Sequence, residues 1–227
     1  MTRIAITGAS GLLEQELVHH FNTLADFIVI PLSHIECDVT DRASVKKILA
    51  AHQSDILINC AVILDVDLCE RDQDHCFAAN QEGVANLVYA TDILKQPLTF
   101  VQVSSSEVLG RVHEGEYFIN GYTESDEPKP SSAYQRPERS SEELIIDAGA
   151  RGMHNLARWF IPRLGWLYGK GRKTYVEYFY EKLQDDKELV VIEDQWRSPI
   201  WAHHAAQWIA LLLAQNYASG IFTLRAP

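Results

Sequence analysis

Two kinds of hydrophobic pattern alternate along the chain. Short apolar runs, many of them β-branched, predict buried strands at 3–7, 26–31, 34–39, 55–60, 98–103, 155–161, 189–192 and 221–224. Apolar residues at helical spacing predict helices at 12–18, 45–52, 84–94, 138–148, 176–183 and 201–212. Residues 110–133 have no clear period and predict a long loop. Strands that alternate with helices predict an α/β fold, in which a doubly wound parallel sheet is covered on both faces.

Length and charge narrow the possible partners. The 227 residues fit one domain, or one domain with an appended lobe. Basic residues number 20 and acidic residues 31, so the formal net charge is −11. Polyphosphate backbones and anionic membrane surfaces repel such an acidic chain. We therefore expect neither a nucleic acid nor a membrane as its partner.

The chain contains no apolar run of the ~18 residues that a membrane span needs. The N-terminal residues lead directly into the first predicted strand, which argues against a signal peptide. We therefore expect a cytoplasmic protein. In that compartment its four cysteines are expected to be reduced thiols; they are Cys37, Cys60, Cys69 and Cys76.

A glycine-rich turn joins the first predicted strand to the first predicted helix. Gly8 and Gly11 lie three positions apart at this junction. Glycines there let a phosphate approach the backbone, where free N–H groups and the helix dipole meet its charge. Two such glycines also occur in ordinary turns. Their place in an alternating strand–helix pattern favours nucleotide binding over a purely structural turn.

From this turn onward the chain resembles the extended short-chain dehydrogenase/reductase superfamily, and within it the dTDP-4-dehydrorhamnose reductase-like proteins, which act on nucleotide sugars. Several segments in family order carry the resemblance. They are TGASGLL at 7–13, CDVTD at 37–41, NCA at 59–61, VDLCE at 66–70, Asn80 with Gly83 and Asn86-Leu87, SSSEV at 104–108, RLGWLYG at 163–169, and Ser198-Pro199.

The resemblance implies a Rossmann domain over residues 1–160 that holds NADP or NAD. Residues 161–227 would supply a small substrate lobe and elements that return to the sheet; because family members usually continue further, we expect this lobe to be short and incomplete. The residues implied to bind the cofactor are Gly8, Ser10, Gly11, Leu12, Asp38, Val39, Asn59, Cys60, Ala61 and Ser104. Asp38 has a second interpretation, in which it caps the following helix. Residues 31–34 contain neither an acid nor an arginine that would select between NAD and NADP.

The resemblance also implies a catalytic pair. Ser105 would hydrogen-bond the substrate carbonyl and Tyr134 would act as the acid/base, assisted in the family by a lysine four residues later. This chain has Glu138 at that position, and a carboxylate there raises the pKa of the tyrosine instead of lowering it. Pro137 predicts that the helix begins at residue 137 and that Tyr134 lies in the preceding loop.

A second departure from the family pattern is Glu14, which replaces the third glycine of the turn. Its bulk and negative charge near a bound pyrophosphate are expected to weaken cofactor affinity. The alternative is a solvated glutamate in the first helical turn, where the helix dipole favours it.

Three further residues are candidates for the substrate site. Glu107 stands where nucleotide-sugar dehydratases carry an acid/base, although a strand-end carboxylate without catalytic function is the alternative. Lys170 and Arg172 could meet the pyrophosphate of a sugar nucleotide, or could belong to a solvated turn. The His and Cys residues lack metal-ligand spacing, so we expect no metal site.

These observations support three hypotheses. The first is an NAD(P)-dependent oxidoreductase that reduces a 4-keto nucleotide sugar, with catalysis impaired by Glu138 and Glu14. The second is an inactive reductase-like protein that serves as a regulatory or interaction subunit. The third is a nucleotide-sugar epimerase or dehydratase that uses Glu107. A nucleotide-sugar-like molecule is the expected partner in the enzymatic readings, and a homodimer is a further partner that the sequence leaves open.

Overall fold

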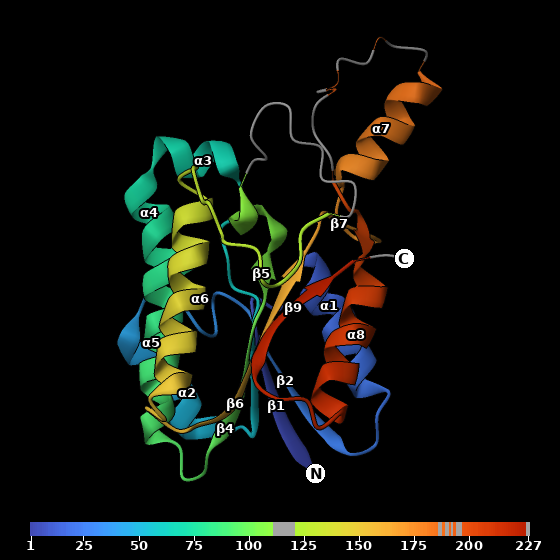
Figure 1. The fold of residues 1–227 in the computed structure, drawn as a ribbon. Helices are drawn as coiled ribbons and strands as arrows, with labels where there is room; N and C mark the ends of the chain where they lie inside the picture. Colours follow the sequence, from blue (N-terminus) through green and yellow to red (C-terminus); the bar gives the residue numbers. More distant parts are fainter. Residues whose placement is uncertain (111–120, 186–187, 189–190, 192, 194–196, 226–227) are drawn as a thin grey trace.

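A computed structural model describes residues 1–110, 121–185, 188, 191, 193 and 197–225 (Figure 1). Seven parallel strands form the central sheet, in the order β2-β1-β3-β4-β6-β5, and β9 also pairs with β6. The strands are β1 (Thr2–Thr7), β2 (Phe27–Leu32), β3 (Ile56–Asn59), β4 (Leu98–Gln102), β5 (Ser104–Ser105), β6 (Leu156–Leu164) and β9 (Gly220–Leu224). Two further short strands, β7 (Leu167–Tyr168) and β8 (Ile200–Trp201), pair with each other.

The central strands are short and almost entirely apolar because both of their faces are covered. Every residue of β3 and β4 is buried, and the last four residues of β1 are buried as well. Ile4 lies beside Ile56, and Ile56 beside Thr99, so the three strands are in register and end at the same edge. The doubly wound parallel sheet expected from the sequence is confirmed.

Helices cover the two faces of the sheet in separate layers (Figure 1). Helices α2, α5 and α6 cover one face, and α1 and α8 cover the other, while α3 and α7 lie beyond the carboxyl ends of the strands. The helices are α1 (Leu12–Asn22), α2 (Arg42–His52), α3 (Val66–Arg71), α4 (Gln73–Phe77), α5 (Gly83–Ala90), α6 (Gln135–Ala150), α7 (Tyr175–Gln184) and α8 (Ala202–Ala214). Within the described ranges, no helix is both long and apolar enough to cross a bilayer.

The strand expected at 34–39 is wrong. These residues form a turn after β2, in which Glu36 accepts hydrogen bonds from the backbone N–H and the hydroxyl of Ser33, both at 2.7 Å. The apolar alternation that suggested a strand includes Ile35, which is 96% exposed. The strand expected at 189–192 and most of the first half of the 110–133 loop lie outside the described residues. Residues 121–133 contain neither helix nor strand, as expected for a loop.

Helix α6 begins before Pro137, contrary to the sequence prediction. Its first residue is Gln135 and its N-cap is Tyr134. Pro137 is therefore the third helical residue, where a backbone N–H has no partner within the helix, so the missing donor is tolerated. Tyr134 has helical backbone angles (φ −77°, ψ −45°) and does not lie in a free loop.

The expectation of four reduced thiols is also wrong. Cys69 and Cys76 form a disulfide, with their Cα atoms 5.1 Å apart. Helices α3 and α4 fold back on each other and bring the two residues within bridging distance. Cys37 and Cys60 are free and buried.

The expected division at residue 160 falls inside strand β6. Beyond it, α8 packs on the sheet and β9 pairs with β6, while α7 and the small β7-β8 sheet stand beyond the carboxyl edge (Figure 1). The assignment of a separate substrate lobe to 161–227 stays a prediction.

Candidate functional site

A chain of buried polar groups marks the carboxyl edge of the sheet. Thr7, Asn59 and Gln102 are the last residues of β1, β3 and β4. The Thr7 hydroxyl donates to Asn59 Oδ1 at 2.5 Å, and Asn59 Nδ2 donates to Gln102 Oε1 at 2.8 Å. These bonds satisfy side chains that would otherwise be costly to bury, and they hold the three strand ends together. Thr7 and Gln102 were not expected as site residues from the sequence, although a polar residue ending a buried apolar strand was a visible signal.

The glycine turn leaves the start of α1 as bare backbone. Gly8 has φ +72°, and a Cβ there would lie 3.0 Å from the backbone N of Ala61 at the end of β3. Only glycine therefore fits this close approach. Gly11 is the N-cap of α1 and offers no side-chain hydrogen bond to the helix. The first N–H groups of α1 are thus free to bind an anionic group.

In this structure the anionic group is the side chain of Glu14. Its carboxylate folds back over Gly11, where any Cβ would overlap it, and the residue is only 8% exposed. Burial raises the pKa of Glu14 to about 7, although hydrogen bonds from the backbone at Glu14 and Leu13 and the charge of Arg172 act in the opposite direction. The interpretation of Glu14 as a solvated glutamate is therefore wrong.

The structure brings Ser105 and Tyr134 together. Ser105 ends β5, and its hydroxyl oxygen accepts a hydrogen bond from the backbone N–H of Glu107 at 3.1 Å. Tyr134 is 6% exposed and packs with Ala133 against the Cys69–Cys76 disulfide. A hydrogen bond with Ser105 lowers the pKa of Tyr134, but burial and the nearby carboxyl groups of Glu138 and Glu107 together raise it well above the ordinary value. The phenol therefore retains its proton throughout the neutral pH range.

Glu138 lies one helical turn beyond Tyr134 and is 4% exposed. Burial, followed by the negative charge of Glu142, raises the pKa of Glu138 to about 8. Among the described residues, neither a hydrogen bond nor a cation offsets these two effects on its pKa. Glu138 is therefore mostly a neutral carboxylic acid at pH 7, and its negative charge appears only at higher pH.

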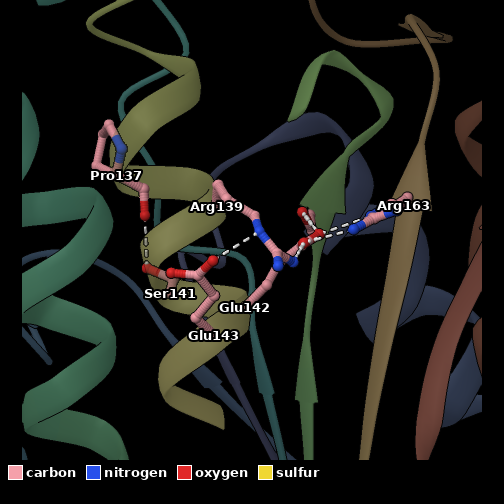
Figure 2. A network of polar contacts seen from close by, with 7 residues as sticks. Pro137, Arg139, Ser141, Glu142, Glu143 and Arg163 are labelled. Carbon is pink, nitrogen blue, oxygen red and sulfur yellow. Dashed lines mark hydrogen bonds and ion pairs between the residues drawn. The ribbon is translucent and has the colours of Figure 1, made fainter. Parts of the chain in front are cut away.

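Glu142, one turn further along α6, is buried and ionically paired (Figure 2). Arg163 of β6 donates to both carboxylate oxygens, with Nε and Nη2 at 2.8 and 2.7 Å. Ser104 donates its hydroxyl to the same carboxylate at 2.7 Å, and Arg139 donates at 3.1 Å. This network ties α6 to β5 and β6, so it positions both Ser105 and Tyr134. Its residues Glu142 and Arg163 were not singled out from the sequence, although an arginine within a buried strand was a signal.

The remaining expected cofactor residues surround the glycine turn and the neighbouring strand ends. Asp38 accepts hydrogen bonds from the backbone N–H and hydroxyl of Thr40 at 2.9 and 2.7 Å, whereas Asp41 caps α2. The interpretation of Asp38 as the helix cap is therefore wrong. The other members are buried or half-buried except for Ser10, which is exposed; they are Leu12, Val39, Asn59, Cys60 and Ala61.

The three substrate candidates do not form one cluster. Glu107 accepts from Trp166 Nε1 at 3.3 Å and pairs with Arg197 at 3.1 Å. Arg172 acts electrostatically on Glu14, so it lies near the start of α1. Lys170 is exposed in the same loop. No group of His, Cys, Asp and Glu side chains suited to a metal ion occurs in the described part of the chain.

Asn80 fixes the loop that follows β3. It belongs to a π-helical turn, Ala78–Glu82, of the kind often found near functional sites. Its side chain accepts from the backbone N–H of Ile63 at 2.8 Å and donates to the Ile63 carbonyl at 3.0 Å. Asn80 therefore orders the backbone between β3 and α3.

We predict that Glu138 makes folding less favourable as pH rises. Because its folded-state pKa is about 8 against an ordinary 4.5, the folded protein holds a proton that the unfolded chain releases. This contribution to stability is complete below pH 4.5 and is lost as pH rises to about 8, at no more than roughly 1.4 kcal/mol per pH unit. Glu138→Gln should equal the wild type near pH 4 and exceed it at pH 8 in urea unfolding. The exposed Glu143→Gln is the control, and parallel pH curves for wild type and Glu138→Gln would contradict the prediction.

Removing the carboxylate of the buried ion pair should destabilise the fold. Glu142→Gln leaves the Arg163 guanidinium buried without a counterion, which costs about 3–5 kcal/mol. Arg139→Gln removes a partly exposed cation from the same carboxylate and should cost less than about 1 kcal/mol. Chemical denaturation measures both changes. Equal effects of the two substitutions would mean that the Glu142–Arg163 pair does not hold α6 to the sheet.

Comparison with known proteins identifies the family of this chain. The family model for the RmlD substrate binding domain matches residues 1–225. The spore coat polysaccharide biosynthesis protein SpsK of Bacillus subtilis is 28% identical over 227 residues, covering 98% of this chain and 72% of that protein. A dTDP-4-dehydrorhamnose reductase of Streptomyces griseus is 28% identical and covers 97% and 69%.

Solved structures give the same result. The crystal structure of a dTDP-4-dehydrorhamnose reductase from Clostridium acetobutylicum matches with a TM-score of 0.84 and 27% identity, covering 100% of this chain and 75% of that one. The corresponding reductase from Bacillus anthracis, in complex with NADP, matches with a TM-score of 0.85 and 24% identity, covering 100% and 76%. The resemblance found in the sequence is confirmed: this chain belongs to the RmlD substrate binding domain family.

Proposed function

We propose that this protein binds NADP or NAD and reduces the 4-keto group of a nucleotide sugar, at a rate limited by Glu138 and Glu14. The observation that carries the proposal is the pairing of half-buried Ser105 with buried Tyr134 at the sheet edge where a bare glycine turn opens α1. The proteins named as dTDP-4-dehydrorhamnose reductases that match nearly the whole chain support the same reaction class.

The residues at the sheet edge fit a dinucleotide on one condition. Gly8 and Gly11 provide the close approach and the free N–H groups that a pyrophosphate needs, and the backbone at 59–61 adjoins the turn. Asp38 and Val39 would lie near the adenine. The condition is that the carboxylate of Glu14, the tip of a flexible side chain, must leave Gly11 or lose its charge. Nothing at the end of β2 selects NADP over NAD.

When bound, the reduced dinucleotide supplies a hydride to the substrate carbonyl. Tyr134 would donate a proton to the developing alkoxide, and the Ser105 hydroxyl would hydrogen-bond the same oxygen. The Ser105 oxygen accepts from the Glu107 N–H, and its own proton is directed to Tyr134, so the substrate oxygen would have to take that hydrogen bond over from the phenol. The raised pKa keeps Tyr134 protonated at neutral pH, which is the form that reduction of a ketone needs, whereas oxidation of an alcohol needs the phenolate. The same shift makes the phenol a weaker proton donor.

Two observations favour the alternative of an inactive scaffold. The Glu14 carboxylate lies over the glycine turn, and Glu138 provides no cation beside Tyr134. The epimerase or dehydratase alternative has less support. Trp166 and Arg197 both bind the carboxylate of Glu107, which leaves it less able to transfer a proton to a substrate.

The proposal predicts that Tyr134→Phe abolishes reduction without preventing cofactor binding. Loss of the proton donor should lower turnover of a 4-keto nucleotide sugar by at least ~100-fold. NADPH consumption measures turnover, and calorimetric titration with NADPH and NADH measures binding. The control is Tyr89→Phe, which changes an exposed tyrosine on α5. A wild type that binds cofactor but shows no turnover would support the hypothesis of an inactive scaffold. Absence of cofactor binding would exclude every hypothesis that depends on NAD(P).

Glu138→Lys should raise the turnover number, by about 10-fold, because a cation one turn from Tyr134 favours release and re-uptake of the phenolic proton. The pH profile should shift toward lower pH as the pKa of Tyr134 falls. Glu143→Lys adds the same charge at an exposed position of α6 and should change neither quantity. A thermal unfolding curve verifies that Glu138→Lys folds. A folded, cofactor-binding variant without any gain in turnover would contradict the assigned role of position 138.

A further inference from the structure

We propose that Glu14 is an internal competitor of the cofactor: its carboxylate occupies the anion site at the start of α1, and in its charged form it excludes the pyrophosphate. The inference rests on the cofactor binding proposed above and adds a residue that controls it. It concerns the first contact of a dinucleotide with the protein, before any chemistry at Tyr134.

The carboxyl group of Glu14 lies where a phosphate would bind. A Cβ on Gly11 would overlap the carboxyl group of Glu14, so this group lies directly on the Gly11 backbone. The backbone N–H groups of Leu13 and Glu14 donate to it. These belong to the unpaired N–H groups of the first turn, which bind phosphate when a dinucleotide lies at the start of such a helix. The carboxylate and the pyrophosphate therefore need the same donors.

The charges around Glu14 also decide whether a second anion can bind beside it. Besides the helix backbone, the charged and titratable groups that act on Glu14 come from two other segments. Arg172, in the loop before α7, attracts its negative charge, and the Cys60 thiol after β3 has its pKa raised by burial and by Glu14. Arg172 is the single cation in this set, and it would have to offset both Glu14 and a diphosphate. Two anions in one desolvated anion site repel strongly, so the carboxylate must be neutral or displaced when the diphosphate binds.

A neighbouring loop also covers part of the start of α1. The loop at 169–171 closes over the start of α1, since a Cβ on Gly169 would touch Leu12 at 3.4 Å and one on Gly171 would approach Gln15 at 3.6 Å. Glu14, between Leu12 and Gln15 in the same helical turn, is 8% exposed. A neutral carboxylic acid can remain in such a space and donate a hydrogen bond to a phosphate oxygen, whereas a carboxylate cannot. Because the pKa of Glu14 is about 7, cofactor affinity should fall as pH rises through neutrality.

The test compares Glu14→Gly and Glu14→Gln with the wild type in calorimetric titrations with NADH and NADPH between pH 6 and 8.5. Both variants should bind about 10-fold more tightly than the wild type at pH 8, and at pH 6 the difference should shrink. Wild type should take up protons on binding above pH 7, as read from the dependence of the heat on the buffer, and Glu14→Gln should not. NADH is included because the 2′-phosphate of NADPH itself titrates near pH 6.

Glu16→Gln removes the same charge from the same helix at a residue that pairs with His203, so it should leave the affinity and its pH dependence unchanged. Thermal unfolding establishes that each variant folds, and the two replacements at position 14 guard against the failure of one. Equal affinities of wild type and both variants would overturn this inference while leaving the proposed function intact. Absence of binding in the wild type and in both folded variants would overturn the inference and the cofactor binding together.

Discussion

A carboxyl group removed from water is stable only if donors or cations offset its charge, or if it holds a proton. Three glutamates of the candidate site meet this constraint in three ways. Glu142 has the full guanidinium of Arg163. Glu14 has the backbone N–H groups that begin α1, with help from Arg172. Glu138 has neither, and a proton is its remaining means of stabilisation. These differences determine which of the three carboxyl groups are charged at neutral pH.

The same constraint explains why α6 carries both a residue that supports the fold and a residue that departs from the family pattern. Along α6, positions 138 and 142 lie one turn apart on the buried face. The pairing of Glu142 with Arg163 and Ser104 fixes α6 against β5 and β6, and thereby holds Tyr134 beside Ser105. A cation at 138 would lie between these two features. Without a cation at position 138, Tyr134 still lies beside Ser105. It lacks only the positive charge that would lower its pKa.

Much of the fold could be predicted from the sequence because the buried strands are nearly continuous in apolar residues and end in polar ones. The failures have physical causes. Alternating apolar residues at 34–39 resembled a strand, but Ile35 faces solvent and Glu36 closes a turn on Ser33. The disulfide depends on how α3 meets α4, which no local pattern encodes. Tyr134 was recognised by resemblance, whereas its burial and its contact with Ser105 depend on tertiary packing.

Glu14 shows that a departure from a family pattern can be visible in the sequence while its consequence is not. Its spacing from Leu17 and Phe21 places it near the buried stripe of α1, which was a signal for burial. Its carboxylate lies back over Gly11, and the cation that acts on it, Arg172, is distant in sequence. Glu14 and Glu138 both become protonated as pH falls below neutrality. These two replacements of family residues then carry no negative charge. The glycine turn then loses the negative charge of Glu14, and Tyr134 loses that of Glu138, within the same pH range. Such a site would be weakened by rising pH without having lost the groups that the proposed reaction needs.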